Sequence, residues 1–289
     1  MGSKEKILPL ITEYIFRREH KKKYLIDPFC GGFSICAYAL ENTKFKVLAN
    51  DLNHYVISLY REMIYNGSEN IKKVWFDWVS HDKFNDVRNN PDKYPEWYVG
   101  YVLTIWSFGN KQGTYLFGKD IEEIKKQAHE YLLLNGYDGT SETRTKLVKE
   151  FKTKTAMEGR FELQQLERLQ QLERLESMDW QDFIKSIDKN ILEDSFIYCD
   201  PPYQDTVKYQ KNSMDYDVFW DWFRKYPYPV YVSSYIAPQD IVPINHTGKR
   251  VLLSSKKRKV AKENIYFNGR GSPTPTMYDL LFNQAKKEL

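Results

Sequence analysis

The chain of 289 residues contains little cysteine, no long apolar run and no large excess of charge of either sign. Its three cysteines, Cys30, Cys36 and Cys199, are too few for a disulfide framework, and neither they nor the five histidines have the spacing of a metal site. No apolar segment approaches the length of a membrane span, and the amino terminus lacks the apolar core of a signal peptide. We therefore expect a soluble, cytoplasmic protein without a membrane segment or a structural metal.

The composition is that of a folded protein. Apolar residues make up 42% and aromatic residues 16% of the chain, which is enough to bury a substantial core and excludes global disorder. Basic residues outnumber acidic ones by only 43 to 39, a balance that permits a polyanionic partner without requiring one. The positions of the charges therefore carry more information than their total.

Apolar runs and helical patterns alternate along the first part of the chain. "YLIDPF" and "FKVLAND" (45–51) have the pattern of buried strands, and each is followed by a helical pattern, at 34–40 and in "HYVISLYREMIYN". Further strands are expected within 191–199, 229–235 and 262–269. This order predicts an α/β fold with a Rossmann-like parallel sheet and helices on both faces.

The middle of the chain has a different character. Residues 68–158 are rich in Trp, Tyr, Asn and Lys, and we interpret them as an inserted, mostly helical segment between the two halves of a sheet domain, 1–67 and 159–289. Leucines then recur at every third position from 163 to 175, which we interpret as a helix whose apolar stripe winds around its axis.

Three predicted strands end on a carboxylate. Asp27 precedes a glycine turn, Asp51 closes the second strand, and Asp200 precedes two prolines, which permit neither helix nor ladder hydrogen bonds. Ligands of open α/β sheets bind at the carboxyl ends of the strands, where a glycine turn can cradle a cofactor and an acid after the second strand can accept ribose hydroxyls. A helix cap would also explain Asp51.

These motifs resemble those of DNA adenine methyltransferases, which transfer a methyl group from S-adenosylmethionine to the amino group of adenine. "DPPY" at 200–203 is similar to their catalytic motif and "DPFCGGFS" at 27–34 to their methionine-binding motif. Three more segments match in the same order: "GSKEKILPLI" at 2–11, "LANDLNHYVISLY" at 48–60 and "SMDWQDFI" at 177–184. The resemblance covers most of the chain, although Phe33 stands where the family often has a second glycine.

The resemblance implies roles for individual residues. The expected catalytic residues are Asp200, Pro201, Pro202 and Tyr203, and the expected cofactor-binding residues are Lys4, Asp27, Phe29, Gly31, Asp51 and Asp200. Asp179 is expected to read the adenine edge, with a helix cap as the alternative, and "SSY" at 233–235 is a candidate border of the same pocket. The inserted segment would recognise the target, and its basic residues, Lys125, Lys146, Lys149 and Lys152 among them, would contact the phosphates of double-stranded DNA.

The chemistry of adenine explains these residue types. Its amino nitrogen is a weak nucleophile, so a site must accept hydrogen bonds from the two N–H groups. The Asp200 carboxylate and the Pro201 carbonyl can each accept one. The base must also be flipped out of the duplex, and Tyr203 offers a ring on which to stack it.

Several alternatives remain open. A cytosine amino-methyltransferase usually has serine at the position of Asp200, and a nicotinamide-dependent oxidoreductase would carry a GxGxxG turn, which is missing from 27–40. An RNA-directed enzyme and a catalytically silent nucleic-acid-binding relative of the same fold are further alternatives. The sequence identifies neither the recognition site nor a partner restriction nuclease.

Overall fold

The computed structural model describes residues 8–66, 69–74, 76–108, 113–135, 172–202, 214–252 and 260–271. The chain separates into two compact units. The sheet unit contains the described residues of 3–50, 172–174 and 178–289, and the helical unit contains those of 51–171 and 175–177. The predicted functional boundaries, at 67/68 and 158/159, stay a prediction.

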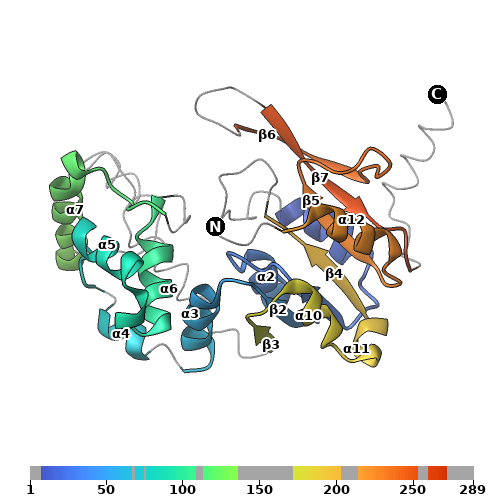
Figure 1. Ribbon diagram of the computed structural model, residues 1–289, viewed down its shortest axis with the longest axis horizontal. Coiled ribbons are helices and arrows are strands. Elements are labelled where there is room, and N and C mark those ends of the chain that lie inside the picture. Colours follow the sequence, from blue (N-terminus) through green and yellow to red (C-terminus); the bar gives the residue numbers. More distant parts are fainter. Residues whose placement is uncertain are drawn as a thin grey trace. The chain divides into compact units, whose positions relative to one another are not determined.

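Seven strands of the described chain form one sheet in the order β3-β2-β1-β4-β5-β7-β6 (Figure 1). β1 is parallel to β2 and β4, and β4 is parallel to β5, whereas β7 is antiparallel to both β5 and β6. This is the doubly wound order with one antiparallel strand inserted near an edge, and the predicted α/β sheet is confirmed. The strands are β1 (Tyr24–Asp27), β2 (Lys46–Asn50), β3 (Leu172–Glu176), β4 (Ser195–Cys199), β5 (Val230–Ser234), β6 (Asn245–Leu252) and β7 (Val260–Phe267).

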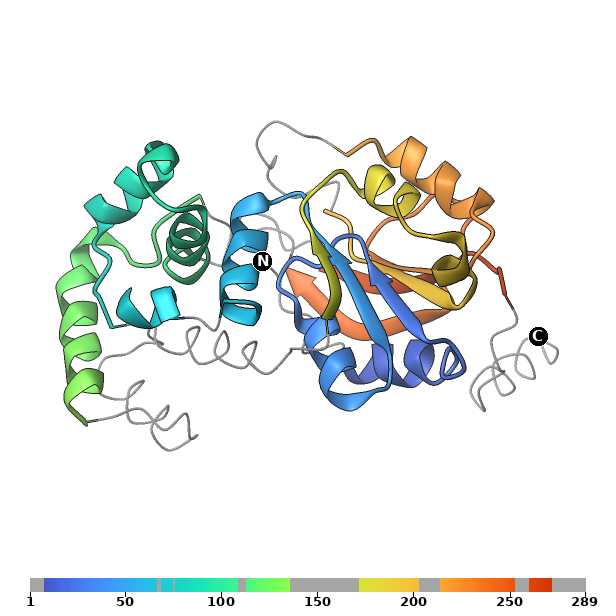
Figure 2. The same ribbon diagram turned by 90° about the horizontal axis from the view of Figure 1, so that it is seen from below.

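Helices cover both faces of the sheet, as predicted. In Figure 2 the blue helices of residues 8–42 lie on one face of the sheet, and the yellow and orange helices lie on the other. The first group is α1 (Leu8–Ile11), the π-helix η1 (Thr12–Phe16) and α2 (Ser34–Asn42), and the second includes α10 (Trp180–Lys185), α11 (Lys189–Glu193) and α12 (Tyr216–Lys225). Because both faces are covered, the central strands are apolar almost throughout.

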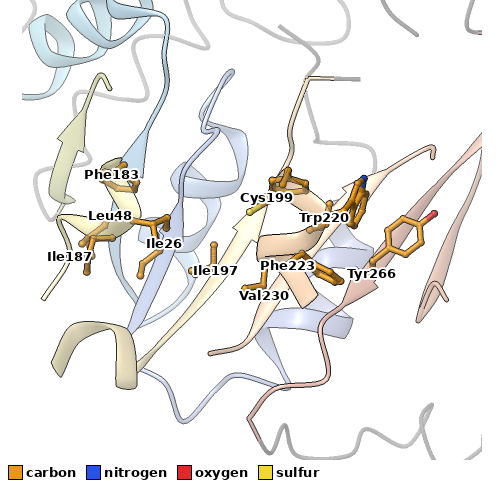
Figure 3. Packing of buried hydrophobic residues seen from close by; sticks show 13 residues of the cluster. Ile26, Leu48, Phe183, Ile187, Ile197, Cys199, Trp220, Phe223, Val230 and Tyr266 are labelled. Carbon is orange, nitrogen blue, oxygen red and sulfur yellow. The ribbon is translucent and has the colours of Figure 1, made fainter. Parts of the chain in front are cut away.

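The core on the α10/α12 face is built from alternate strand residues (Figure 3). Ile26 and Ile197, from neighbouring strands, belong to the same buried cluster as Phe183 of α10 and Phe223 of α12. On the opposite face the rings of Phe16, Phe45 and Phe196 meet edge to face, with centroids 5.0–6.0 Å apart. The central strand β4 therefore contributes Ile197 to one core and Phe196 to the other, which fixes its register against its neighbours.

The end of the leucine repeat differs from the sequence prediction. Leu172–Glu176 form strand β3 at the sheet edge, so the helix expected to continue to Leu175 is wrong there, and the earlier part of the repeat lies outside the described residues. Leu172 and Leu175 are buried on this strand. Pairing with β2 outweighs the helical preference of Leu, Glu and Arg, because local propensity is a weak determinant beside tertiary pairing.

The described part of the helical unit contains α3 (His54–Ile64), α4 (Glu69–Val74), α5 (His81–Asn89), α6 (Glu96–Ile105) and α7 (Glu122–Asn135), with short 3₁₀ turns η2 (Pro91–Lys93) and η4 (Lys119–Ile121). Gly100 lets α6 approach α3 closely, since a Cβ there would lie 2.0 Å from the Tyr55 carbonyl oxygen. The predicted mostly helical character is confirmed for this part. None of the described helices is long and apolar enough to cross a membrane.

Candidate active site

The turn after β1 is organised by the carboxylate of Asp27. This side chain is buried, and its Oδ1 accepts a hydrogen bond from the backbone N–H of Phe29 at 3.1 Å. Its Oδ2 accepts from the thiol of Cys36 on α2 at 3.4 Å. Burial, and secondly the nearby charge of Asp27, raise the pKa of the Cys36 thiol well above its ordinary value, so the thiol stays protonated and donates. Asp27 thereby joins the strand end to the following helix.

Two residues of this turn have positive φ angles. Gly31 has φ 43°, and Phe33 has φ 63° and ψ 4°, in the left-handed region that favours glycine. The Phe33 ring is only 1% exposed, so burial of the ring offsets the strain of the backbone. Phe33 therefore adopts a backbone conformation that glycine would adopt without strain.

Asn50, the last residue of β2, ties three segments together. Its Nδ2 donates to the carbonyl oxygens of Pro28 (3.1 Å) and Met178 (3.0 Å), while its Oδ1 accepts from the N–H of Met178 (3.0 Å). Its own carbonyl accepts from the N–H of Cys30 at 2.8 Å. The side chain is 1% exposed. Asn50 thus holds the turn after β1 and the segment before α10 at the end of the second strand.

Asp200 follows β4 directly, at the same sheet edge as Asp27, because β1 and β4 are neighbouring parallel strands. Its side chain is half-buried, and its Oδ1 accepts from the hydroxyl of Ser233 at 3.2 Å. Pro201 is buried and Pro202 is exposed, and the Tyr216 hydroxyl at the start of α12 donates to the Pro202 carbonyl. The loop is thus held by contacts from the β5 end and from α12, and the strand order reverses between β1 and β4 where it lies.

Aromatic rings gather beside the turn after β1. Phe29 is half-buried, with its ring centroid 6.1 Å from that of Trp180 and 6.0 Å from that of Phe219. Trp180 also meets Trp222 at 4.9 Å. These rings come from the turn, from α10 and from α12, so Phe29 is fixed by packing from two helices.

Asp51 and Asp179 each accept a hydrogen bond from the backbone N–H two residues further along the chain. Asp51 follows β2, and its Oδ1 accepts from the N–H of Asn53 at 2.9 Å. Asp179 is exposed and caps α10, accepting from the N–H of Gln181 at 2.8 Å. The helix cap expected as the alternative for Asp179 is therefore present, and its part in reading adenine stays a prediction.

The arrangement collects hydrogen-bond acceptors where a ligand of this fold would lie. Asp27, Asn50 and Asp200 stand at the carboxyl ends of β1, β2 and β4, and the glycine turn lies beside the reversal of strand order. Carboxylates at this edge can accept hydrogen bonds from the amino and hydroxyl groups of a ligand. Among the described residues no cluster of His, Cys, Asp and Glu could hold a metal ion.

The sequence matches the family of D12 class N6 adenine-specific DNA methyltransferases over residues 1–226. The chain belongs to this family. It is thus an adenine-specific DNA methyltransferase with a Rossmann-like fold, and it acts on DNA with a methyl donor. The matched range includes the glycine turn, Asn50 and the Asp200 loop.

Several predicted site residues of the methyltransferase lie outside the described residues: Lys4, Tyr203, Lys146, Lys149 and Lys152. Lys125, on α7, is described and is only 5% exposed, with its Nζ 5.8 Å from the centroid of the Phe117 ring. Burial lowers the pKa of this lysine. Its expected phosphate contact stays a prediction.

Three further residues organise the methyltransferase site, and none of them was assigned a role of its own from the sequence. Asn50 holds the turn after β1, Tyr216 holds the loop after β4, and Ser233 donates to the Asp200 carboxylate. Of these only Ser233 was anticipated, as part of a strand end bordering the pocket. The asparagine before Asp51 could have been recognised as a buried polar residue in an apolar strand, which needs hydrogen-bond partners.

Proposed function

We propose that the protein is a site-specific methyltransferase that transfers the methyl group of S-adenosylmethionine to the exocyclic amino group of an adenine flipped out of double-stranded DNA. The observation that carries the proposal is the position of Asp200, Pro201 and Pro202 directly after β4, beside the turn of β1. The runner-up, methylation of the cytosine amino group, uses the same fold and donor and is an outcome of the experiments below.

The residues at the strand ends suit S-adenosylmethionine. Gly31 has no side chain and a positive φ, so the turn can approach a ligand closely. The carboxylates of Asp27 and Asp51 suit the amino group and the ribose hydroxyls of such a molecule, and Phe29 offers an apolar ring. Lys4, outside the described residues, would add a contact near the amino terminus. When bound, S-adenosylmethionine supplies an electrophilic methyl group.

Asp200 and Pro201 would activate the amino group of adenine. The nitrogen lone pair is delocalised into the ring, and hydrogen bonds from the two N–H groups to acceptors favour the pyramidal, nucleophilic form. We assign one acceptor to the Asp200 carboxylate and the other to the Pro201 carbonyl. When the nitrogen takes the methyl group and the carbon–sulfur bond of the donor breaks, positive charge would develop on the nitrogen. The Asp200 carboxylate would stabilise this charge until the surplus proton passes to solvent, and S-adenosylhomocysteine would be released.

The target base would be held outside the duplex by stacking. An adenine amino hydrogen inside a duplex is paired, so the base must be flipped out at a cost of a few kcal/mol. We assign the stacking partner to Tyr203 and the reading of the base edge to Asp179. An aromatic stack is worth about 1–3 kcal/mol per base, which offsets most of this cost.

The helical unit would recognise the DNA sequence. Ser107 and Tyr115 form an antiparallel bridge, and the N–H of Phe108 donates to the Thr114 carbonyl at 2.9 Å, so residues 107–108 and 114–115 pair as the two arms of a hairpin. Phe108 is 68% exposed, although large apolar rings are usually buried. We assign base contacts to this hairpin and phosphate contacts to Lys146, Lys149 and Lys152. We expect the protein to act in the cytoplasm, and a restriction nuclease cutting the same sequence is a partner to be sought.

The test replaces Asp200 by alanine and measures single-turnover transfer of labelled methyl groups to DNA. Loss of transfer with unchanged far-ultraviolet circular dichroism is expected. Asp194→Ala is the matched control, since Asp194 lies at the opposite end of β4 and pairs only on the surface with Lys23, at 3.0 Å. Near-normal transfer by the Asp200 variant would refute the assigned mechanism.

A further inference from the structure

A chain of hydrogen bonds leads from the interior of the sheet to Asp200. The Tyr198 hydroxyl donates to the Ser233 hydroxyl at 3.0 Å, and the Ser233 hydroxyl donates to Oδ1 of Asp200 at 3.2 Å. Tyr198 and Ser233 are each 0% exposed. The parallel pairing of β4 with β5, in which Cys199 faces Val232, brings the three side chains together.

The direction of this chain is fixed by chemistry. An ionised carboxylate can only accept, so the single hydrogen of Ser233 must point to Asp200. The Ser233 oxygen is then the acceptor for Tyr198. Burial, with a smaller contribution from the charge of Asp200, raises the pKa of Tyr198 well above its ordinary value, so the phenol stays protonated and can donate. Both hydroxyls therefore have one orientation each.

We propose that Ser233 is a positioning residue of the methyl-transfer reaction, which holds the Asp200 carboxylate in the orientation that accepts the adenine amino hydrogen, and that Tyr198 in turn orients Ser233. The inference rests on the proposed role of Asp200. A carboxylate has about four lone-pair positions, so it can accept from Ser233 and from the substrate at once.

The need for such support follows from the loop itself. Asp200 lies past the last residue of β4, and the prolines after it cannot donate backbone hydrogen bonds, so the strand ladder does not continue through the loop. The carboxylate must nevertheless stand within hydrogen-bond reach of one hydrogen of the substrate. Misplacing a reacting group by about 1 Å can cost about 100-fold in rate.

The first experiment measures kcat and the KM values for DNA and S-adenosylmethionine in Ser233→Ala. The single-turnover rate is expected to fall about 10- to 100-fold, with both KM values unchanged. The thermal unfolding midpoint should be lower, because the buried Tyr198 hydroxyl loses its acceptor, but the variant should be fully folded at the assay temperature. Ser195→Ala is the matched control, because this equally buried serine lies at the opposite end of β4 from Asp200 and its hydroxyl donates to the Leu192 carbonyl at 2.9 Å. A rate within twofold of wild type for Ser233→Ala, or an equal loss in the control, would overturn the proposal.

The second experiment tests the order of the chain. Tyr198→Phe removes only a hydroxyl and should slow transfer less than Ser233→Ala does. In the Ser233→Ala background it should have no further effect, because the link to Asp200 is already broken. Losses that multiply in the double variant would contradict the chain. If Asp200→Ala is active, the proposed function fails; if it is inactive while Ser233→Ala is normal, only this inference fails.

Discussion

The backbone of Phe33 predicts an unusual order of stability among substitutions. Phe33→Ala loses a ring that is 1% exposed, which costs about 3–5 kcal/mol of unfolding free energy. It keeps the left-handed φ of 63°, which costs an L-residue about 1–2 kcal/mol. Phe33→Gly loses the same ring but relieves that strain. The greater conformational freedom of glycine in the unfolded chain lowers the unfolding free energy of this variant by about 0.4–1 kcal/mol.

The midpoints of these two ranges favour glycine over alanine by about 0.8 kcal/mol at this position. Both variants should be less stable than wild type, since losing the ring outweighs the relief of strain. Urea unfolding followed by circular dichroism gives the midpoints. At Ile35, a buried residue of helix α2, alanine should instead be more stable than glycine by about 1 kcal/mol. If alanine is at least as stable as glycine at Phe33, the strain argument is wrong.

Three further changes have expected outcomes. Asn50→Leu removes three side-chain hydrogen bonds and should lower the free energy of unfolding in urea by about 3 kcal/mol. Asn53→Ala, which removes one helix cap, should lower it by only about 1 kcal/mol. Equal losses would argue against the role of Asn50 in joining the three segments. Burial raises the pKa of Glu19 above its ordinary 4.5, although the Tyr231 hydroxyl donates to it. The protonated carboxyl therefore stabilises the fold at low pH, and this stability is lost as pH rises through the raised pKa. Glu19→Gln should gain stability relative to wild type over that rise, and a difference that does not depend on pH would contradict this. Asp51→Ala should weaken S-adenosylhomocysteine binding in calorimetry far more than DNA binding, and an unchanged affinity would remove Asp51 from the cofactor site.

The sequence predicted the central sheet because its strands are short apolar runs ending at Asp27, Asn50 and Cys199, and covered parallel strands need such runs. β3 and β6 could not be predicted in this way. β3 has the composition of a helix, and β6, "NHTGKRVL", has no apolar run, so both depend on a neighbouring strand that local patterns do not reveal.

The same distinction applies to the site. Asp27, Asp51 and Asp200 could be identified because each stands at a strand end, Asp27 beside a glycine turn and Asp200 before two prolines. The contact of Ser233 with Asp200 depends on the register between β4 and β5, which two separate segments set only on folding. Likewise, the left-handed φ of Phe33 cannot be inferred from a bulky residue, since such residues rarely adopt it.

The central claim is that the Asp200 loop methylates the amino group of adenine. The most direct measurement incubates the protein with duplex DNA and S-adenosylmethionine carrying an isotopically labelled methyl group, digests the DNA to nucleosides and identifies the labelled one by mass spectrometry. The account predicts label in N6-methyladenine alone, at a defined sequence, and none with Asp200→Ala. Label in N4-methylcytosine, or label that persists in the Asp200 variant, would contradict it.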